Sequence, residues 1–113
     1  MDRQLQEPTR LVLTALADAP RHGYAIIQEV LAISAGRTRL STGTLYTALD
    51  RLLQQGLIEV ESEEVVGGRM RRTFQLSGKG QEVLVEEAGR LRQTVTETER
   101  RLAVRLRANG AVA

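Results

Sequence analysis

Gly56 separates two hydrophobic patterns that belong to different kinds of secondary structure. Before it, Leu45, Leu49 and Leu52 recur at intervals of three and four residues, which places them on one face of a helix. After it, apolar or small residues alternate with glutamates over residues 58–63, which is the period of a half-buried strand. The chain must therefore pass directly from an amphipathic helix into a strand, and this order predicts a mixed fold.

A β-hairpin is predicted to follow that helix. Its second strand lies over residues 73–76, where Phe74 and Leu76 face inward, and Gly67-Gly68 marks the turn because glycine adopts positive φ without steric cost. The basic residues at or beside the tip are Arg69, Arg71 and Arg72. The glutamates of the first strand are interpreted as its solvated face, with repulsion of misplaced phosphate as the alternative.

The helix before Gly56 begins near Ser41, whose hydroxyl can accept a hydrogen bond from an early backbone N–H. A phosphate contact is the alternative role of this serine. The outer face of the helix carries short, hydrogen-bonding side chains of the kind that read base edges in a major groove, although an ordinary surface helix has a similar face. The candidates for base contacts are Thr42, Thr44, Thr47 and Arg51. Tyr46 flanks the apolar stripe, so its ring can pack while its hydroxyl reaches a phosphate.

Two shorter helices are predicted before residue 41. Apolar spacing indicates a first helix over residues 9–17, which ends before Pro20 because proline disfavours helix in the residue preceding it. A second helix opens at His22-Gly23-Tyr24 and continues to about Ile33, and His22 is interpreted as a local hydrogen-bond partner rather than a ligand. A break at Gly36 then leads to the third helix, and this succession is the order of a helix-turn-helix.

Basic residues lie on both sides of the third helix, although the net charge of the chain is only +2. Residues 65–80 contain no acidic side chain, and residues 35–51 contain one. Such clusters are commonly solvated charge, but two of them beside a polar helix favour a phosphate footprint. The candidates for phosphate contacts are Arg37, Arg39, Arg69, Arg71 and Arg72, with Lys79 as a further one.

A long helix is predicted from the end of a loop over residues 77–80 to about Arg107, a length on the order of 40 Å. Its inward positions follow heptad spacing, as in helices that pair with one another. They are Leu84, Ala88, Leu91, Val95, Thr98 and Leu102. In a chain of 113 residues this stripe favours dimerisation. Packing against residues 9–17 is the alternative, and the two can hold together.

Composition excludes several classes of function. The chain has no cysteine and one histidine, so we expect no disulfide framework and no metal site. It has no nucleophile–histidine–acid set, and Gly78-Lys79-Gly80 lacks the spacing of a phosphate loop, so we expect no enzyme and no cofactor. No segment approaches the roughly 20 apolar residues that span a bilayer, and we expect a soluble cytoplasmic protein without a membrane partner.

The order of these elements and their motifs resembles the PadR family of winged helix-turn-helix regulators over roughly residues 10–107. The motifs that carry the resemblance are His22-Gly23-Tyr24, Ser41-x-Gly43-Thr44-Leu45-Tyr46, Leu49-x-x-Leu52, Gly56-Leu57-Ile58, Gly67-Gly68-Arg69, Phe74-x-Leu76 and Gly80. The chain departs from the family at Thr47, where a proline commonly follows the tyrosine.

This resemblance implies a mainly α fold with a small β-hairpin. A winged helix-turn-helix would cover residues 8–77, and one C-terminal dimerisation helix would cover residues 78–108. It also implies a homodimeric regulator, usually a repressor, that binds a pseudo-palindromic operator in double-stranded DNA and releases it when a small molecule binds near the dimer interface. The contact residues that it implies are Ser41, Thr42, Thr44, Tyr46, Thr47, Arg69 and Arg71. Residues 77–113 contain no aromatic side chain, so we expect no stacked drug site there. The alternative function is a winged-helix module that binds protein.

Overall fold

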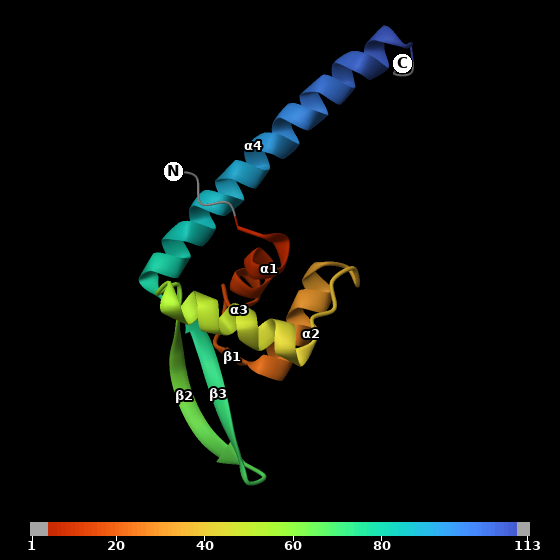
Figure 1. Cartoon of the computed structure of the whole chain (residues 1–113). Coiled ribbons are helices and arrows are strands. Elements are labelled where there is room, and N and C mark those ends of the chain that lie inside the picture. The colour runs from red at the N-terminus through yellow and green to blue at the C-terminus, as the bar shows by residue number, and fades with distance from the viewer. Residues whose placement is uncertain (1–4, 111–113) are drawn as a thin grey trace.

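The computed structural model describes residues 5–110, in which four helices and a three-stranded antiparallel sheet surround one apolar core (Figure 1). The helices are α1 (Glu7–Ala15), α2 (Gly23–Ile33), α3 (Thr42–Gln54) and α4 (Gly78–Ala108). The strands are β1 (Arg21–His22), β2 (Ile58–Val66) and β3 (Arg69–Leu76), in the spatial order β1-β3-β2. The predicted winged helix-turn-helix with a long C-terminal helix is confirmed.

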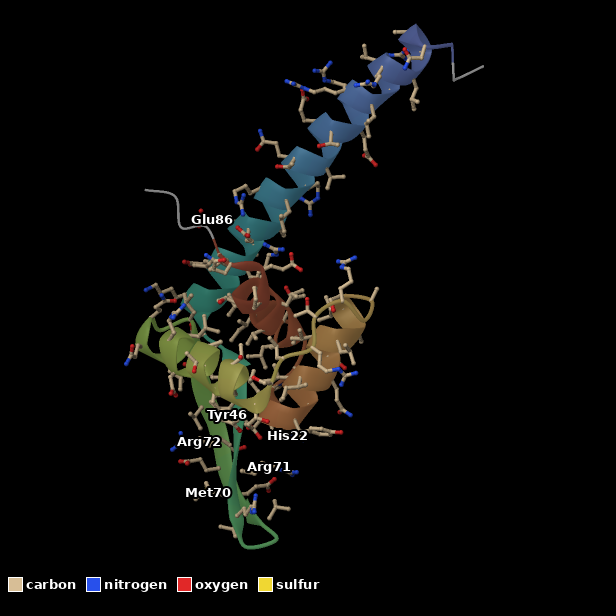
Figure 2. The ribbon with its side chains drawn as sticks, turned by 45° about the vertical axis from the view of Figure 1, so that its right-hand side comes forward. His22, Tyr46, Met70, Arg71, Arg72 and Glu86 are labelled. Carbon is tan, nitrogen blue, oxygen red and sulfur yellow. The ribbon has the colours of Figure 1, made fainter. Side chains whose placement is uncertain are left out.

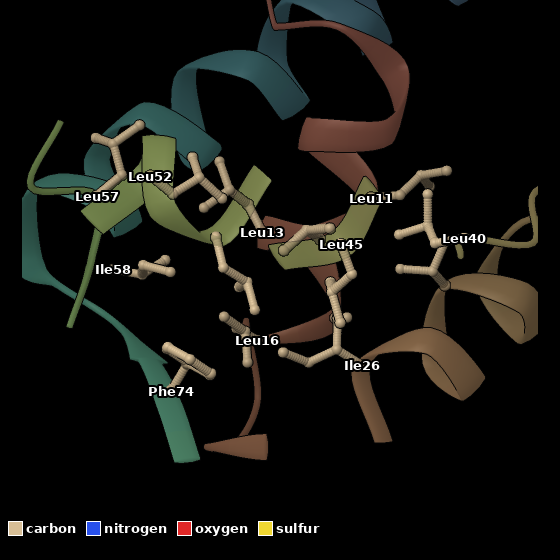
Figure 3. Close-up of a cluster of buried hydrophobic side chains, with 14 residues drawn as sticks. Leu11, Leu13, Leu16, Ile26, Leu40, Leu45, Leu52, Leu57, Ile58 and Phe74 are labelled. Atoms are coloured by element: carbon tan, nitrogen blue, oxygen red, sulfur yellow. The ribbon is translucent and has the colours of Figure 1, made fainter. Parts of the chain in front are cut away.

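The apolar stripe of α3 forms the centre of the core, as its spacing predicts. Leu45, Leu49 and Leu52 are all fully buried, and Figure 3 shows Leu45 and Leu52 among side chains from α1, α2 and the sheet. Phe74 of β3 is the only aromatic residue of the core that residues 5–110 form. Residues 5–110 bury a cluster made of Leu11, Val12, Leu13, Ala15, Leu16, Ile26, Val30, Leu40, Leu45, Leu49, Leu52, Leu57, Ile58 and Phe74.

The β2–β3 hairpin projects from the body on the side opposite to α4 (Figure 1). Its turn has φ of 58° at Gly67 and 79° at Gly68, which is the left-handed pair that a two-residue hairpin turn requires. The expectation of a half-buried first strand is wrong beyond Ile58, because every later residue of β2 is exposed. A register shift between Val60 and Ser62 also interrupts the alternation, and the hairpin leaves the body after this bulge.

Two further expectations differ from the structure. The segment predicted as a loop over residues 77–80 is the first turn of α4, because the Ser77 hydroxyl caps the helix by accepting a hydrogen bond of 3.0 Å from the N–H of Gly80. Strand β1 was not predicted, since two residues give no alternating pattern. It pairs Arg21 with Phe74 and His22 with Thr73, which fastens the segment before α2 to the sheet.

Helix α4 begins against the body and then extends away from it (Figure 1). Val83 and Leu84 pack on the core, whereas no side chain from residue 91 to residue 110 is buried. Intramolecular packing therefore accounts for the first position of the predicted heptad stripe and leaves the rest exposed. Within residues 5–110, no helix is both long and apolar enough to cross a bilayer.

Candidate nucleic-acid interface

The outer face of α3 is exposed along its whole length. Ser41 caps the helix as predicted, because its hydroxyl oxygen accepts a hydrogen bond of 3.1 Å from the N–H of Thr44. The same hydroxyl donates to Oγ1 of Thr44 over 2.9 Å, which leaves the Thr44 hydroxyl free to donate outward. All eleven predicted contact residues are exposed, namely Arg37, Arg39, Ser41, Thr42, Thr44, Tyr46, Thr47, Arg51, Arg69, Arg71 and Arg72. That they contact DNA stays a prediction.

Tyr46 lies between α3 and the start of α2. Its side chain is 43% exposed, and its ring reaches over Gly23, the first residue of α2 (Figure 2). A β-carbon at Gly23 would stand 2.7 Å from the Tyr46 hydroxyl oxygen. The preceding residue, His22, caps α2 by accepting a hydrogen bond of 3.4 Å from the N–H of Ala25, which confirms its predicted local role.

A groove of about 680 Å³ runs between α3 and the beginning of α1. One wall consists of residues of α3 and its cap, four of which are predicted DNA contacts, and the other belongs to a helix that the sequence placed only in the core. The residues lining it are Gln6, Pro8, Thr9, Ser41, Gly43, Thr44, Thr47, Ala48 and Arg51. Gln6, Pro8 and Thr9 were missed because the apolar spacing of α1 describes its buried face and says nothing of where its polar first turn lies.

The connection between α2 and α3 is held in shape by Ser34, which is 2% exposed. Its hydroxyl donates to the Leu31 carbonyl over 3.1 Å and accepts from the N–H of Thr38 over 2.9 Å. Ala35 and Gly36 adopt positive φ beside it. This turn presents Arg37 and Arg39 to solvent on the approach to the start of α3.

The hairpin pairs two of its three arginines with its own glutamates. Arg71 contacts Glu64 at 2.8 Å, and Arg72 contacts Glu63 at 3.0 Å, as the cross-strand register requires. Across β2 and β3 there are four glutamates and three arginines, so the hairpin has no excess of positive charge. Arg69, beside the turn, forms no ion pair within residues 5–110. The charge count over residues 65–80 did not reveal this neutralisation, because the glutamates precede the turn and the arginines follow it.

The tip of the hairpin is apolar as well as charged. Val65 and Met70 face each other across the two strands and are 68% and 61% exposed. Figure 2 shows Met70 near the end of the hairpin, beyond Arg71 and Arg72. The surface that the hairpin offers farthest from the body is therefore Arg69 with an exposed apolar pair.

Lys79 lies beside the C-terminal end of α3. Its Nζ donates to the carbonyl of Gln55 over 3.0 Å, where the unpaired carbonyls of a helix C-terminus attract cations. Its interaction in the folded chain is thus with the protein backbone, and the sequence expectation of a phosphate contact is not supported by this geometry.

The predicted dimerisation residues form a stripe along α4 that remains largely uncovered. The exposed fraction is 37% for Leu91, 54% for Val95 and 51% for Leu102. The flanks of the stripe are charged and internally paired. Hydrogen bonds donated by Arg100 and Arg101 lower the pKa of Glu97 below its ordinary value, and Glu97 in turn raises the pKa of Arg100.

Comparisons with known proteins show similarity to transcriptional regulators. The sequence profile described as the transcriptional regulator PadR-like family matches residues 12–86. The transcriptional regulator Rv3488 of Mycobacterium tuberculosis is 36% identical over 86 residues, which cover 76% of this chain and 77% of that protein. An uncharacterized 37.1 kDa protein in transposon TN4556 of Streptomyces fradiae is 45% identical over 78 residues. That match covers 69% of this chain but only 21% of the Streptomyces protein, so the chain spans about a fifth of that relative.

Solved structures share the fold at low sequence identity. A PadR family transcription regulator from Clostridium difficile superposes with a TM-score of 0.71 at 21% identity, over 86% of this chain and 99% of that one. PadR from Bacillus subtilis, solved in complex with operator DNA, superposes with a TM-score of 0.66 at 17% identity, over 74% of this chain and 48% of that one.

Proposed function

The chain belongs to the PadR-like family of transcriptional regulators, and from this premise we propose that it binds double-stranded operator DNA as a homodimer and represses transcription. Its family and structural relatives are transcription regulators rather than enzymes, in agreement with the expectation from composition. Residues 8–77 would serve as the DNA-binding unit, and residues 78–108 would join the two copies.

The observation that carries this proposal is the exposed polar face of α3 on a helix whose opposite face is fully buried. Thr44, Thr47 and Arg51 are exposed on that face, while the leucines behind them fix the helix to the core. Because the helix backbone is fixed to the core, these side chains start from defined positions when they meet base edges, where one good bidentate contact is worth about 1–3 kcal/mol. The Bacillus subtilis relative was solved with operator DNA, which supports the same use of the fold here.

Phosphate contacts would come from arginines around that face. Arg37 and Arg39 lie on the turn before α3, and Arg69 lies at the tip of the hairpin. Each phosphate neutralised by a cation releases counterions, so the affinity would fall as salt rises. Arg71 and Arg72 would contribute less, because a glutamate already neutralises each of them.

The homodimer would form through the stripe of α4. Exposed Leu91, Val95 and Leu102 lie at heptad spacing, and a second copy of the same helix is the partner that matches this spacing. A two-fold dimer would place two α3 helices in successive major grooves, about 34–36 Å apart, on a pseudo-palindromic operator. A small molecule bound beside the stripe would shift both reading helices together and release the DNA.

The test begins with selection of bound sequences from random DNA, followed by mobility-shift titrations at several salt concentrations. We expect a two-fold symmetric site and an affinity that falls steeply with salt. The variant Thr44→Ala/Thr47→Ala should lose sequence preference, whereas Thr96→Ala, at an exposed threonine of α4, should bind as the parent does. A winged-helix module that binds protein would instead select no sequence and show little dependence on salt.

A further inference from the structure

Besides the packing of Val83 and Leu84 on the core, helix α4 is joined to the body at two buried points, seven residues apart on one face. The first point is Gly80, in the first turn of the helix, and the second is Glu87, two turns farther along. These are the only two buried residues of α4 in the described part of the chain. One is a glycine and the other a carboxylate, so neither belongs to the apolar stripe that the heptad spacing identifies.

The first point joins α4 to the end of α3. The Ser77 hydroxyl donates to the carbonyl of Gly56 over 2.6 Å, and the N–H of Ser77 donates to the carbonyl of Leu57 over 3.1 Å. Gly80 lies so close to Leu57 that a β-carbon at residue 80 would overlap the Leu57 carbonyl oxygen. The start of α4 therefore takes its position directly from the residues that end the reading helix.

The second point joins α4 to α1 through charge. Glu87 is 4% exposed, and its carboxylate contacts the Arg10 guanidinium at 3.5 Å and the Arg90 guanidinium at 2.7 Å. Arg90 belongs to the same helix as Glu87, so Arg10 supplies the contact between elements. Glu86, the residue before Glu87, is exposed.

A buried carboxylate contributes little net free energy to a contact between two helices. The desolvation of the charges offsets much of their attraction, so an apolar pair of similar volume often stabilises as much or more. The contact between the two helices is, however, a hydrogen bond from Arg10 Nη1 to Glu87 Oε2 of 3.5 Å, which is already long, so a small rotation or shift of α4 over α1 would break it. An apolar contact at the same place would tolerate sliding and rotation of α4 over α1.

We infer that Glu87 and Arg10 are positioning residues that fix the angle of α4 to the body, and thereby the separation of the two reading helices in the dimer. This inference rests on the proposed homodimer. The junction at Gly80 fixes where α4 starts, and the ion pair at Glu87 fixes its direction. Without the ion pair, only the Gly80 junction and the half-buried Val83 and Leu84 would hold α4, and a small change of its angle there would move the second body by many ångströms at the far end of the helix.

The test measures the distance between the two copies in solution. The chain has no cysteine, so Gln54→Cys, at an exposed residue near the end of α3, allows one spin label for each copy. Pulsed electron–electron double resonance should give a single narrow peak in the distribution of label-to-label distances for the parent and for Glu86→Gln. The variants Glu87→Gln and Arg10→Gln should lose this narrow peak and give a broad distribution while remaining dimers.

If Glu87→Gln fails to fold, Arg10→Gln still tests the inference. In Arg10→Gln the buried Glu87 carboxylate keeps its ion pair with Arg90, so we expect this variant to fold. A narrow, unshifted peak in folded Arg10→Gln or Glu87→Gln would overturn the positioning role. The absence of any distance between copies in the parent would overturn the homodimer itself. On operator DNAs whose half-site spacing is changed by one base pair, the two variants should lose the preference for one spacing. An equal loss of affinity at every spacing would mark a merely structural role and overturn the inference.

Discussion

The hydroxyl oxygen of Tyr46 on α3 occupies space above Gly23 on α2, only 2.7 Å from where a β-carbon of residue 23 would stand. The position of this tyrosine therefore depends on a glycine that precedes it by more than twenty residues in the chain. Tyr46 is partly exposed, so its ring can rotate outward if the space is filled. Steric change at Gly23 thus reaches the proposed DNA surface without passing through the core.

Gly23→Ala should weaken DNA binding about fivefold with little change in stability, because a displaced hydroxyl loses roughly 1 kcal/mol of hydrogen bonding. Titration of the operator and thermal unfolding measure the two quantities. Tyr46→Phe removes the nearest of the atoms that a β-carbon would meet, so adding Gly23→Ala to it should weaken binding much less than Gly23→Ala alone does. Full operator affinity in both single variants would show that Tyr46 makes no contact with DNA.

Removing the glutamates of the hairpin should strengthen DNA binding. In Glu63→Gln/Glu64→Gln, Arg72 and Arg71 lose their ion pairs and become available to phosphates. The slope of log affinity against log salt should then steepen by up to about 2. The stability should change little, because exposed ion pairs contribute only about 0–1 kcal/mol each.

The opposite test in the hairpin is Arg69→Gln, which removes an arginine that no glutamate neutralises and should therefore weaken DNA binding. It should also reduce the salt slope by about 1, and both effects should be larger than those of Arg71→Gln or Arg72→Gln. Equal effects of all three arginine variants would show that the ion pairs of the free chain do not limit contact with DNA.

Gly80→Ala should destabilise the fold by about 1–3 kcal/mol, because its β-carbon would overlap the backbone carbonyl of Leu57 and force α4 away from α3. Gly78→Ala is the control in the same helical turn, where an added β-carbon meets nothing within 4 Å. It should be neutral or stabilise by up to about 1 kcal/mol, since alanine favours helix over glycine. Urea titrations followed by circular dichroism would measure both.

Val95→Glu should give a folded monomer. The residue is 54% exposed on the proposed contact stripe, and a carboxylate there would be desolvated against its own copy. Val104→Glu is the control, because this residue is equally exposed but lies about 200° around the helix from Leu102. Sedimentation velocity should show a dimer for Val104→Glu. A dimer in Val95→Glu as well would exclude the stripe as the interface.

Local patterns in the sequence predicted the parts of the fold that rest on local physics. The leucine spacing of α3, its cap at Ser41 and the left-handed turn at Gly67-Gly68 each depend on neighbouring residues, and each is present in the structure. Gly56 has φ of 74° and ends α3, as its identity indicates. The same holds for the long helix α4, whose length follows from an uninterrupted run without proline.

The missed features all depend on residues far apart in the chain. Glu87 reads as one more charge on a solvated helix until α1 brings Arg10 against it. From the sequence, Gly80 was predicted to lie in a loop, because its contact with Leu57 is not visible there. Likewise, Arg71 and Arg72 were predicted to be unpaired, because only the strand register places glutamates beside them. Spacing rules describe one element at a time, and these contacts join two.

The outer half of α4 could change in length without affecting the folded body. From residue 91 to residue 110 no side chain is buried, so an insertion there would leave the folded body intact. Seven added residues would keep the phase of the leucine stripe and lengthen the rod by about 10 Å. In the proposed dimer, the length of α4 would then set the spacing between the two half-sites, and α3 would set the base sequence of each. Either property could change while the other is kept.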